Sequence, residues 1–573
     1  MKKICAIVIS MLIICCNATA INAENVNDIA VKKVGAVNVE KSYDTLVDGQ
    51  DQVVLSVGIG TDKGQLNYSD SMVGGGDGPE TFTVTIDKTI YIVDNVNKRV
   101  NVYKDGSFEY DIDVPYITYV RSIVVSKNMI YLMDYDTGTI YVINSAGKIL
   151  KKVFIDQGMN YYLMRKLYVQ DDGSVWLSYE NKIDGEGERG IECSYSIEDL
   201  AEGNANYIEG YVKDGVNTYS IPIIGSNLAL IKETKVKKVK EEKNNSVSTF
   251  RVSSNEMLAN AKILDVDADD NVFVDVFETV NASKVIGEYT VRKYSDGECV
   301  GITDIDLDRY YYMPNNVLNV SEDGNLYQLV CGVDEVQILK KGFVQPLNFT
   351  SNINKIKDQV LKEQLKTELC DAYATTYVNA PNDETSTLQN AMKCCLLTWN
   401  YKAANAKNPN VSNISTPDYL KNVSKPSEQT GIPYCWGGFD GISTSSSSSW
   451  SNFKDAMSKG KFAGNVKTST SGYQSGTAGL DCSGFVSSVA GFSHKLSTSD
   501  LASNTYTKSI SVSNRKIYDI YVKSGTHVVY YVGKTNDGIS TREATTTGDD
   551  KTKLYSRSTS WLSGYSLRRF RGW

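Results

Sequence analysis

The chain has 573 residues, more than the roughly 250–300 that one hydrophobic core supports, so a single domain is excluded and two or three are expected. Hydrophobic residues make up 41% of the chain, which is ample for globular cores. The formal net charge is −8, yet the part from Lys425 onward holds 18 Lys and Arg against 10 Asp and Glu, so a basic region follows a larger acidic one.

Residues 1–23 are predicted to be a secretory signal peptide. Lys2 and Lys3 precede an apolar run from Ile4 to Cys16, and small residues follow, with cleavage expected after Ala20 or Ala23. The run is too short to span a membrane, and no later segment is long and apolar enough. We therefore expect a secreted protein, extracellular or associated with a cell wall, with no transmembrane segment after cleavage. Residues 24–50 are expected to form an N-terminal segment.

Residues 51–348 are predicted to form a β-propeller of about six blades. The segments "TIYIVDNVNKRVNVYKDG" and "MIYLMDYDTGTIYVINSAG" begin 40 residues apart, so that Tyr91 and Asp94 recur at Tyr131 and Asp134. Three further segments repeat the first half of this pattern, and a weaker blade is expected around 215–230. A turn-and-strand unit of about 40–50 residues is typical of a propeller blade. The recurring Tyr and Asp residues are expected to pack blades and cap turns.

Residues 349–424 are predicted to be a helical connector. Ile356, Val360 and Leu361 have helical spacing, and a second helix is expected after a cap at Ser386 or Thr387.

Residues 425–573 contain the cysteine that is most suited to catalysis. Cys482 lies in "LDCSGFVSSVAG", where an apolar pattern predicts a helix beginning at the cysteine. The chain has only two histidines, His494 and His527, and both lie in this region. A thiol becomes a nucleophile as its thiolate, which an imidazole and a helix N-terminus stabilise. His527 begins a Val/Tyr-rich strand and is the predicted base, whereas His494 is expected to be exposed.

The imidazole needs a third polar group to fix its tautomer and orientation. A hairpin after His527 would lay the segment "ISTREATTT" beside it, with Thr541, Glu543 and Thr545 on one face. We predict Glu543 as the orienting acceptor. The alternative is a surface carboxylate, in which case Thr541, Thr545 or Asn536 is the third group.

These motifs resemble those of the NlpC/p-sixty family of papain-like cell-wall cysteine peptidases. The resemblance rests on "DCSGF", "HVVYYVG" and the upstream "PYCWGG" of residues 433–438. It implies a papain-like α+β catalytic domain over residues 425–573, with Cys482 as nucleophile and His527 as base. The third residue of that family is usually His, Asn or Gln, so Glu543 is a departure. The propeller segments resemble NHL-type propellers.

The resemblance also implies a substrate, the peptide stems of peptidoglycan. Relatives cut beside a D-glutamyl residue, often before a diamino acid. In some of them the counterparts of Tyr434, Asp481 and Ser483 hold the free amine of the stem. Trp436, in the same lead-in motif, is also assigned to substrate binding, and core packing is the alternative for both aromatic residues.

The expected function is therefore a secreted peptidoglycan hydrolase, a cysteine endopeptidase that cleaves an amide of the stem peptide. No metal or cofactor is expected, and nucleic acid is not an expected partner. The basic region suits an anionic wall, and the propeller is expected to bind a cell-wall glycan or protein. Two alternatives remain open. One is an amidase or transferase with the same dyad. The other is a propeller adhesin or scaffold that the C-terminal domain anchors to the wall.

Overall fold

The structure is a computed structural model that describes residues 49–69, 76–155, 163–181, 191–214, 217–221, 227–239, 242–280, 285–360, 377–406, 411–468, 472–535 and 537–573. The predicted signal peptide and almost all of the N-terminal segment lie outside these residues. Within them, no helix has both the length and the apolar character needed to cross a membrane.

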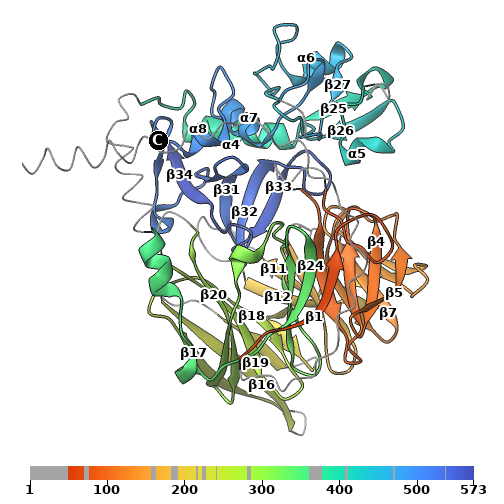
Figure 1. The fold of residues 1–573 in the computed structure, drawn as a ribbon, viewed down its shortest axis with the longest axis vertical. Coiled ribbons are helices and arrows are strands. Elements are labelled where there is room, and N and C mark those ends of the chain that lie inside the picture. Colours follow the sequence, from red (N-terminus) through yellow and green to blue (C-terminus); the bar gives the residue numbers. More distant parts are fainter. Residues whose placement is uncertain are drawn as a thin grey trace, which may run out of the picture. The chain divides into compact units, whose positions relative to one another are not determined.

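Six four-stranded antiparallel sheets in the described residues form the blades of a β-propeller (Figure 1). Each of the first five blades uses four consecutive strands. Blade one contains β2 (Pro79–Val84), β3 (Ile90–Asp94), β4 (Arg99–Lys104) and β5 (Ser107–Asp113). Blade two contains β6 (Val120–Ser126), β7 (Met129–Asp134), β8 (Thr139–Ile143) and β9 (Ile149–Phe154). Blade three contains β10 (Met164–Val169), β11 (Val175–Asn181), β12 (Ile191–Ser196) and β13 (Ile208–Glu209), with the short helix α2 (Ile197–Ala201) after β12.

The remaining blades follow in chain order. Blade four contains β14 (Tyr211–Lys213), β15 (Asn217–Ser220), β16 (Leu228–Val239) and β17 (Glu242–Ser253), where the weaker blade is predicted. Blade five contains β18 (Met257–Val266), β19 (Val272–Thr279), β20 (Gly287–Ser295) and β21 (Glu298–Asp304). Blade six contains β22 (Leu318–Val320), β23 (Leu326–Cys331), β24 (Glu335–Lys340) and β1 (Gln52–Gly58). Because β1 pairs with β24, the first strand of the chain completes the last blade and closes the ring.

The recurring residues of the repeat have the expected structural roles. Tyr91 and Tyr131 occupy the second strands of blades one and two, β3 and β7. Asp94 accepts a hydrogen bond from the backbone of Asn97 at 3.0 Å, as a turn-capping residue does. Asp134 is fully buried and accepts hydrogen bonds from two backbone N–H groups. The predicted propeller of about six blades is therefore present.

The C-terminal region is built around a six-stranded antiparallel sheet with the order β29-β34-β30-β31-β32-β33. The strands are β29 (Thr507–Ser509), β30 (Ile520–Lys523), β31 (His527–Thr535), β32 (Gly538–Ala544), β33 (Thr552–Ser558) and β34 (Ser566–Phe570). Helix α7 (Cys482–Val489) packs against β31 and β32, and α8 (Thr498–Ala502) packs against β30. Smaller elements precede α7: β25 (Thr398–Tyr401), α5 (Asp418–Lys421), β26 (Ser427–Thr430), α6 (Phe453–Ser458), β27 (Phe462–Ala463) and β28 (Thr477–Ala478).

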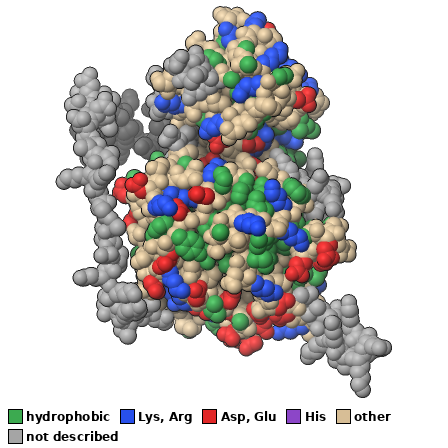
Figure 2. All heavy atoms as spheres, turned by 90° about the vertical axis from the view of Figure 1, so that its right-hand side faces the viewer, with side chains coloured by type: hydrophobic (Ala, Val, Ile, Leu, Met, Phe, Trp, Pro, Cys, Tyr) green, Lys and Arg blue, Asp and Glu red, His purple; other side chains and the backbone are tan. Residues whose placement is uncertain are grey.

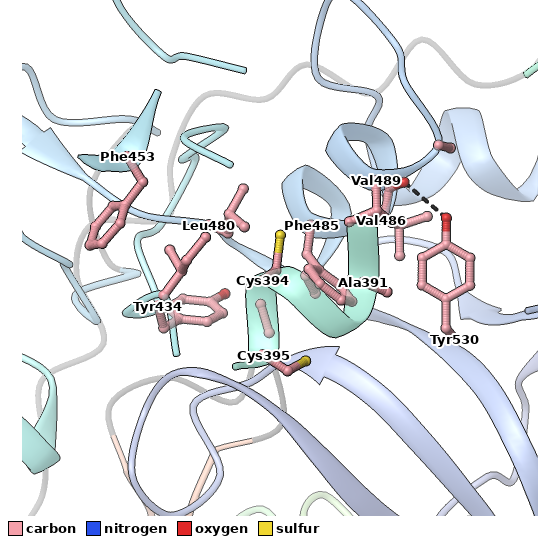
Figure 3. Packing of buried hydrophobic residues seen from close by; sticks show 14 of the residues in the cluster. Ala391, Cys394, Cys395, Tyr434, Phe453, Leu480, Phe485, Val486, Val489 and Tyr530 are labelled. Carbon is pink, nitrogen blue, oxygen red and sulfur yellow. Dashed lines mark hydrogen bonds between the residues drawn. The ribbon is translucent and has the colours of Figure 1, made fainter. Parts of the chain in front are cut away.

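Helix α4 (Glu384–Cys395) belongs to the core of the C-terminal region, although its residues fall in the predicted connector. It packs against α7, and Figure 3 shows Ala391 and Cys394 beside Phe485 and Val486 of that helix. Its cap also differs from the expected one, because Asp383 accepts a hydrogen bond from the backbone of Ser386 at 2.7 Å. Residues 353–360 are helical, and most of the first predicted connector helix lies outside the described residues.

The propeller and the C-terminal sheet share hydrophobic cores. One cluster joins Phe277 and Tyr289 of blade five to Tyr521 and Tyr531 of the sheet. Tyr555 of β33 lies within a second cluster, which otherwise consists of propeller residues. The chain from Leu46 to Trp573 accordingly forms one contact unit.

Figure 2 shows how charge is distributed on one face. Basic and fewer acidic side chains are scattered over its upper part, and hydrophobic side chains gather in the middle of its lower part with acidic and basic side chains around them. No large field of a single sign covers this face.

Candidate active site

Cys482 is the first residue of α7, as the sequence predicts. Asp481 is its N-cap residue and accepts a hydrogen bond from the backbone N–H of Gly484 at 2.7 Å. This cap satisfies one of the free N–H groups in the first turn of the helix. The thiol therefore sits where the partial positive charge of the helix favours an anion.

The glycines of "PYCWGG" and "DCSG" let these two segments meet. A side chain at Gly484 would place its Cβ 2.0 Å from the carbonyl oxygen of Gly438. Gly437 adopts a φ of +73° and donates its N–H to Asp481 at 3.0 Å. The backbone N–H of Cys435 also donates to Leu480 at 3.0 Å. The two motifs are thus one structural unit that fixes the start of α7.

His527 and Glu543 are in direct contact. His527 begins β31, Glu543 lies near the end of the neighbouring strand β32, and His527 Nε2 is 2.9 Å from Glu543 Oε2. Both side chains are fully buried. Thr541 donates its hydroxyl to Glu543 Oε1 at 2.6 Å, so the predicted face of β32 is present.

Arg557 is a further partner of Glu543. It lies on β33, is fully buried, and donates from Nε and Nη2 to the two carboxylate oxygens at 3.1 and 2.8 Å. Burial by itself raises the pKa of Glu543, but the charge of Arg557 and the hydrogen bond from His527 lower it to well below its ordinary value. Glu543 is consequently an ionised carboxylate.

An ionised Glu543 fixes the tautomer of His527. A carboxylate only accepts hydrogen bonds, so the proton of the neutral imidazole lies on Nε2 and Nδ1 keeps its lone pair. Nδ1 is buried and has no hydrogen-bond partner among the described residues. Burial lowers the pKa of His527 below its ordinary value, while Glu543 raises it and Arg557 lowers it. His527 is therefore a neutral base at neutral pH.

The thiol of Cys482 faces the start of β31. Burial raises its pKa to about 12, the charge of Asp481 adds to this, and Lys495 and the backbone N–H of Val528 lower it. Val528 directly follows His527, so these contacts bring the thiol to the histidine end of the strand. Both members of the dyad are neutral in this arrangement, whereas the sequence suggested a thiolate–imidazolium pair. The reason is burial, because Cys482 is only 3% exposed and His527 is fully buried.

The oxygens of Asp481 are already occupied. Oδ1 accepts from the backbone of Gly484 and from Ser483 at 3.1 Å, and Oδ2 accepts from the backbone of Gly437. Lys495 places its ammonium 3.0 Å from Oδ2. A substrate amine at this carboxylate would have to replace Lys495. The role of Asp481 and Ser483 in amine binding stays a prediction, and it requires that the amine replace Lys495.

Tyr434 and Trp436 both contact the core cluster that contains Cys482. Tyr434 is fully buried, its pKa is raised first by burial and then by the nearby Cys482 and Asp481, and its hydroxyl has no partner among the described residues. Trp436 is half-buried and packs against the core cluster that contains Tyr434 and Cys482. His494 is exposed, as expected.

Two aromatic residues of the segment 559–565 lie close to His527 and Cys482. The Trp561 ring stands edge-on to His527 with the ring centroids 5.9 Å apart. Burial raises the pKa of Tyr565, nearby Arg557 lowers it, and nearby Glu543 and Cys482 raise it further. The backbone of this segment exchanges two hydrogen bonds with Val285 of the propeller.

The sequence did not identify Arg557, Lys495 or Trp561. Arg557 pairs across the sheet with Ile539 rather than with Glu543, so its contact depends on a long side chain that reaches diagonally. Lys495 reaches Asp481 from the loop after α7. Such contacts depend on tertiary packing and leave no periodic signal.

Comparisons with known proteins do not assign the site. No family model matches the chain, and no curated protein matches it. Solved structures similar in part include hydrazine synthase of Kuenenia stuttgartiensis, which is 13% identical with a TM-score of 0.30 over 50% of this chain and 84% of that chain. A member of the duf4221 family from Bacteroides vulgatus is 10% identical with a TM-score of 0.31 over 52% and 98%. Virginiamycin B lyase from Staphylococcus aureus is 10% identical with a TM-score of 0.27 over 51% and 99%. Because these TM-scores are low, the propeller rests on the strand pairing of the chain itself.

Proposed function

We propose that the chain is a secreted peptidoglycan hydrolase in which Cys482 attacks an amide bond of the stem peptide. One observation carries the proposal. A cysteine at the first turn of a helix faces the start of the strand that holds His527, whose ring is oriented by Glu543 and whose Nδ1 has no hydrogen-bond partner in the described part of the chain. A nucleophile, a base and an orienting acceptor are the groups that acyl transfer by a cysteine needs.

The neutral dyad indicates how the reaction begins. His527 Nδ1 takes the thiol proton as the sulfur bonds to the amide carbon, and the backbone N–H of Cys482 stabilises the negative charge on the amide oxygen. The imidazolium then gives its proton to the leaving amine as the C–N bond breaks. Water attacks the resulting thioester with His527 as base, which releases the new carboxylic acid and restores the thiol.

The choice of substrate rests on the resemblance of residues 433–438, 480–485 and 527–533 to cell-wall peptidases. A Cβ at Gly484 would lie 2.0 Å from the Gly438 carbonyl oxygen, and one at Gly438 would lie 2.5 Å from the Gly479 carbonyl oxygen. This packing supports the resemblance, since it explains why both motifs have glycine at these positions. The bond next to D-glutamate is the proposed target. An amidase or transferase with the same residues would differ only in its products.

The scaffold alternative has one observation in its favour. Cys482, His527 and Glu543 are all buried, so a substrate reaches them only if the packing around them opens. A protein in which this packing never opens would be a binding module.

Solubilisation of purified cell walls separates these functions. The full-length protein should release soluble muropeptides, and Cys482→Ala should release none. Cys435→Ser is the matched control, because Cys435 is also buried and its thiol shares a hydrogen bond of 3.2 Å with the Thr477 hydroxyl. Equal release by wild type and by a folded Cys482→Ala protein would refute the proposed nucleophile.

A further inference from the structure

Arg557 is the buried charge on which the orientation of His527 depends. Its guanidinium contacts both oxygens of Glu543, and it also donates to Thr545 at 3.1 Å and Thr547 at 3.2 Å. A planar guanidinium that binds a carboxylate through two nitrogens fixes the plane of that carboxylate as well as its charge.

The guanidinium is itself held between two rings. Its central carbon lies 4.0 Å from the ring centre of Trp561 and 4.4 Å from that of Tyr555. Tyr555 packs in turn on propeller residues Tyr119 and Tyr135, with ring centroids 6.3 and 5.3 Å apart. Next to it, Tyr135 and Ser556 share a hydrogen bond of 3.0 Å. The propeller thus supports the strand that carries Arg557.

The protonation state of Glu543 decides which nitrogen of His527 is the base. As a carboxylate it accepts a hydrogen bond from Nε2–H, and Nδ1 is then the unprotonated nitrogen. As a carboxylic acid it would donate to Nε2, which would move the ring proton to Nδ1 and remove the lone pair that the proposed reaction uses. Without a compensating cation, a buried carboxyl group takes up a proton at a higher pH.

We infer that Arg557 is a positioning residue of the proposed hydrolase: it keeps Glu543 ionised and in plane, and through it holds His527 in the tautomer with a free Nδ1. The geometry of the Arg557–Glu543–His527 chain carries this inference. It rests on the proposed function for its catalytic consequence, but the tautomer itself is measurable without a substrate.

The direct test is nitrogen NMR of the full-length protein labelled with ¹⁵N-histidine, in a His494→Gln background so that only His527 is observed. We expect Nε2 to carry the proton in the parent protein at pH 6–8. Arg557→Met should move the proton to Nδ1 at a higher pH than in the parent protein, because Glu543 then protonates about one to three pH units higher. Arg542→Met is the matched control, since Arg542 lies on β32 next to Glu543 but bonds to Tyr518 at 2.5 Å.

Hydrolysis of a soluble stem peptide gives the catalytic consequence. Arg557→Met should lower kcat on the order of 10–100-fold with little change in KM, and should move the acid limb of the rate profile to higher pH. Arg557→Lys keeps the positive charge. It should return the acid limb to its wild-type position and recover part of the wild-type kcat.

A double variant guards against a folding defect. Arg557→Met alone leaves a buried carboxylate uncompensated, whereas Arg557→Met combined with Glu543→Gln removes both charges. The double variant should be about as active as Glu543→Gln alone. The inference is overturned if Arg557→Met and Arg542→Met give the same His527 tautomer and the same titration of His527. It is also overturned if the kcat loss of the double variant equals the product of the losses of Arg557→Met and Glu543→Gln. A tautomer change without hydrolysis by the parent protein would refute the proposed function and leave the role of Arg557 standing.

Discussion

The pKa values of Cys482 and His527 determine how the dyad begins its reaction. Burial raises the pKa of the thiol to about 12 and lowers the pKa of the imidazole. Above pH 6.5, the ordinary pKa of histidine, His527 is therefore already the free base. The proposed hydrolysis should lose rate only as the pH falls below about 6.5, with no early alkaline limb.

Glu543 should set the position of that acid limb. Its hydrogen bond and charge raise the pKa of His527, so Glu543→Gln should lower this pKa and move the acid limb to lower pH while keeping substantial activity. Glu543→Ala leaves the ring without an orienting acceptor and should lose on the order of 10–100-fold in kcat. The measurement is a kcat profile from pH 5 to 9. If Glu543→Ala follows the wild type throughout, Glu543 has no role in the reaction.

Lys495 should decide whether Asp481 recognises a free amine. Its ammonium occupies the carboxylate at 3.0 Å, where a stem amine is expected. Lys495→Met should therefore lower KM for a stem peptide with a free N-terminal amine, by a few-fold. The same peptide with an acetylated amine is the control and should not gain. An equal change for both peptides would show that Asp481 only caps α7 and supports the motif glycines.

At the scale of elements, the start of α7 depends on a close approach of two backbones. In an ordinary helix, replacing Gly by Ala stabilises by about 1 kcal/mol, but here the added Cβ would lie 2.0 Å from the Gly438 carbonyl oxygen. Gly484→Ala should instead destabilise the protein by about 1–3 kcal/mol and reduce the activity that depends on Cys482. Thermal unfolding and the hydrolysis assay measure both effects.

Gly58→Ala is the control for this substitution. Gly58 ends β1, has no left-handed φ, and has no atom within 4 Å of an added Cβ. Its substitution should leave stability almost unchanged. A Gly484→Ala protein as stable as Gly58→Ala would mean that the two motifs are not packed as described.

The elements that the sequence could predict are those with a strong local pattern. The propeller follows from a repeat that places Tyr91 and Tyr131 on equivalent strands, and α7 follows from the apolar spacing after Cys482. The contact between the His527 and Glu543 side chains could be predicted from the sequence, because the two residues lie on the two strands of one hairpin. The cap at Asp383 and the contacts of Arg557 and Lys495 were not, since they depend on packing between segments far apart in the chain.

At the scale of the whole molecule, the propeller supports the C-terminal sheet. Arg121 of β6 lies 4.3 Å from the ring centre of Tyr135 and donates to Ser556, and Asp136 pairs with Lys553 at 3.1 Å. Gly548 donates its N–H to Asp77 at 2.9 Å. These contacts surround β33, the strand that carries Arg557.

This shared core predicts cooperative unfolding. Residues 49–573 should melt in a single calorimetric transition, and residues 377–573 alone, which keep α4, should not reach a stable fold, because Tyr521, Tyr531 and Tyr555 would lose the propeller residues that bury them. Differential scanning calorimetry of both chains tests this. Two well-separated transitions in the longer chain, or a cooperative transition in the shorter one, would show that the two regions are independent.

Mass spectrometry of the fragments released from purified peptidoglycan tests the central claim most directly. The account predicts fragments with a new free carboxyl group on D-glutamate and a new free amine on the next residue, formed by the wild-type protein and absent with Cys482→Ala. Fragments that carry only new glycan ends, or the same peptide ends with Cys482→Ala as with the wild type, would contradict it.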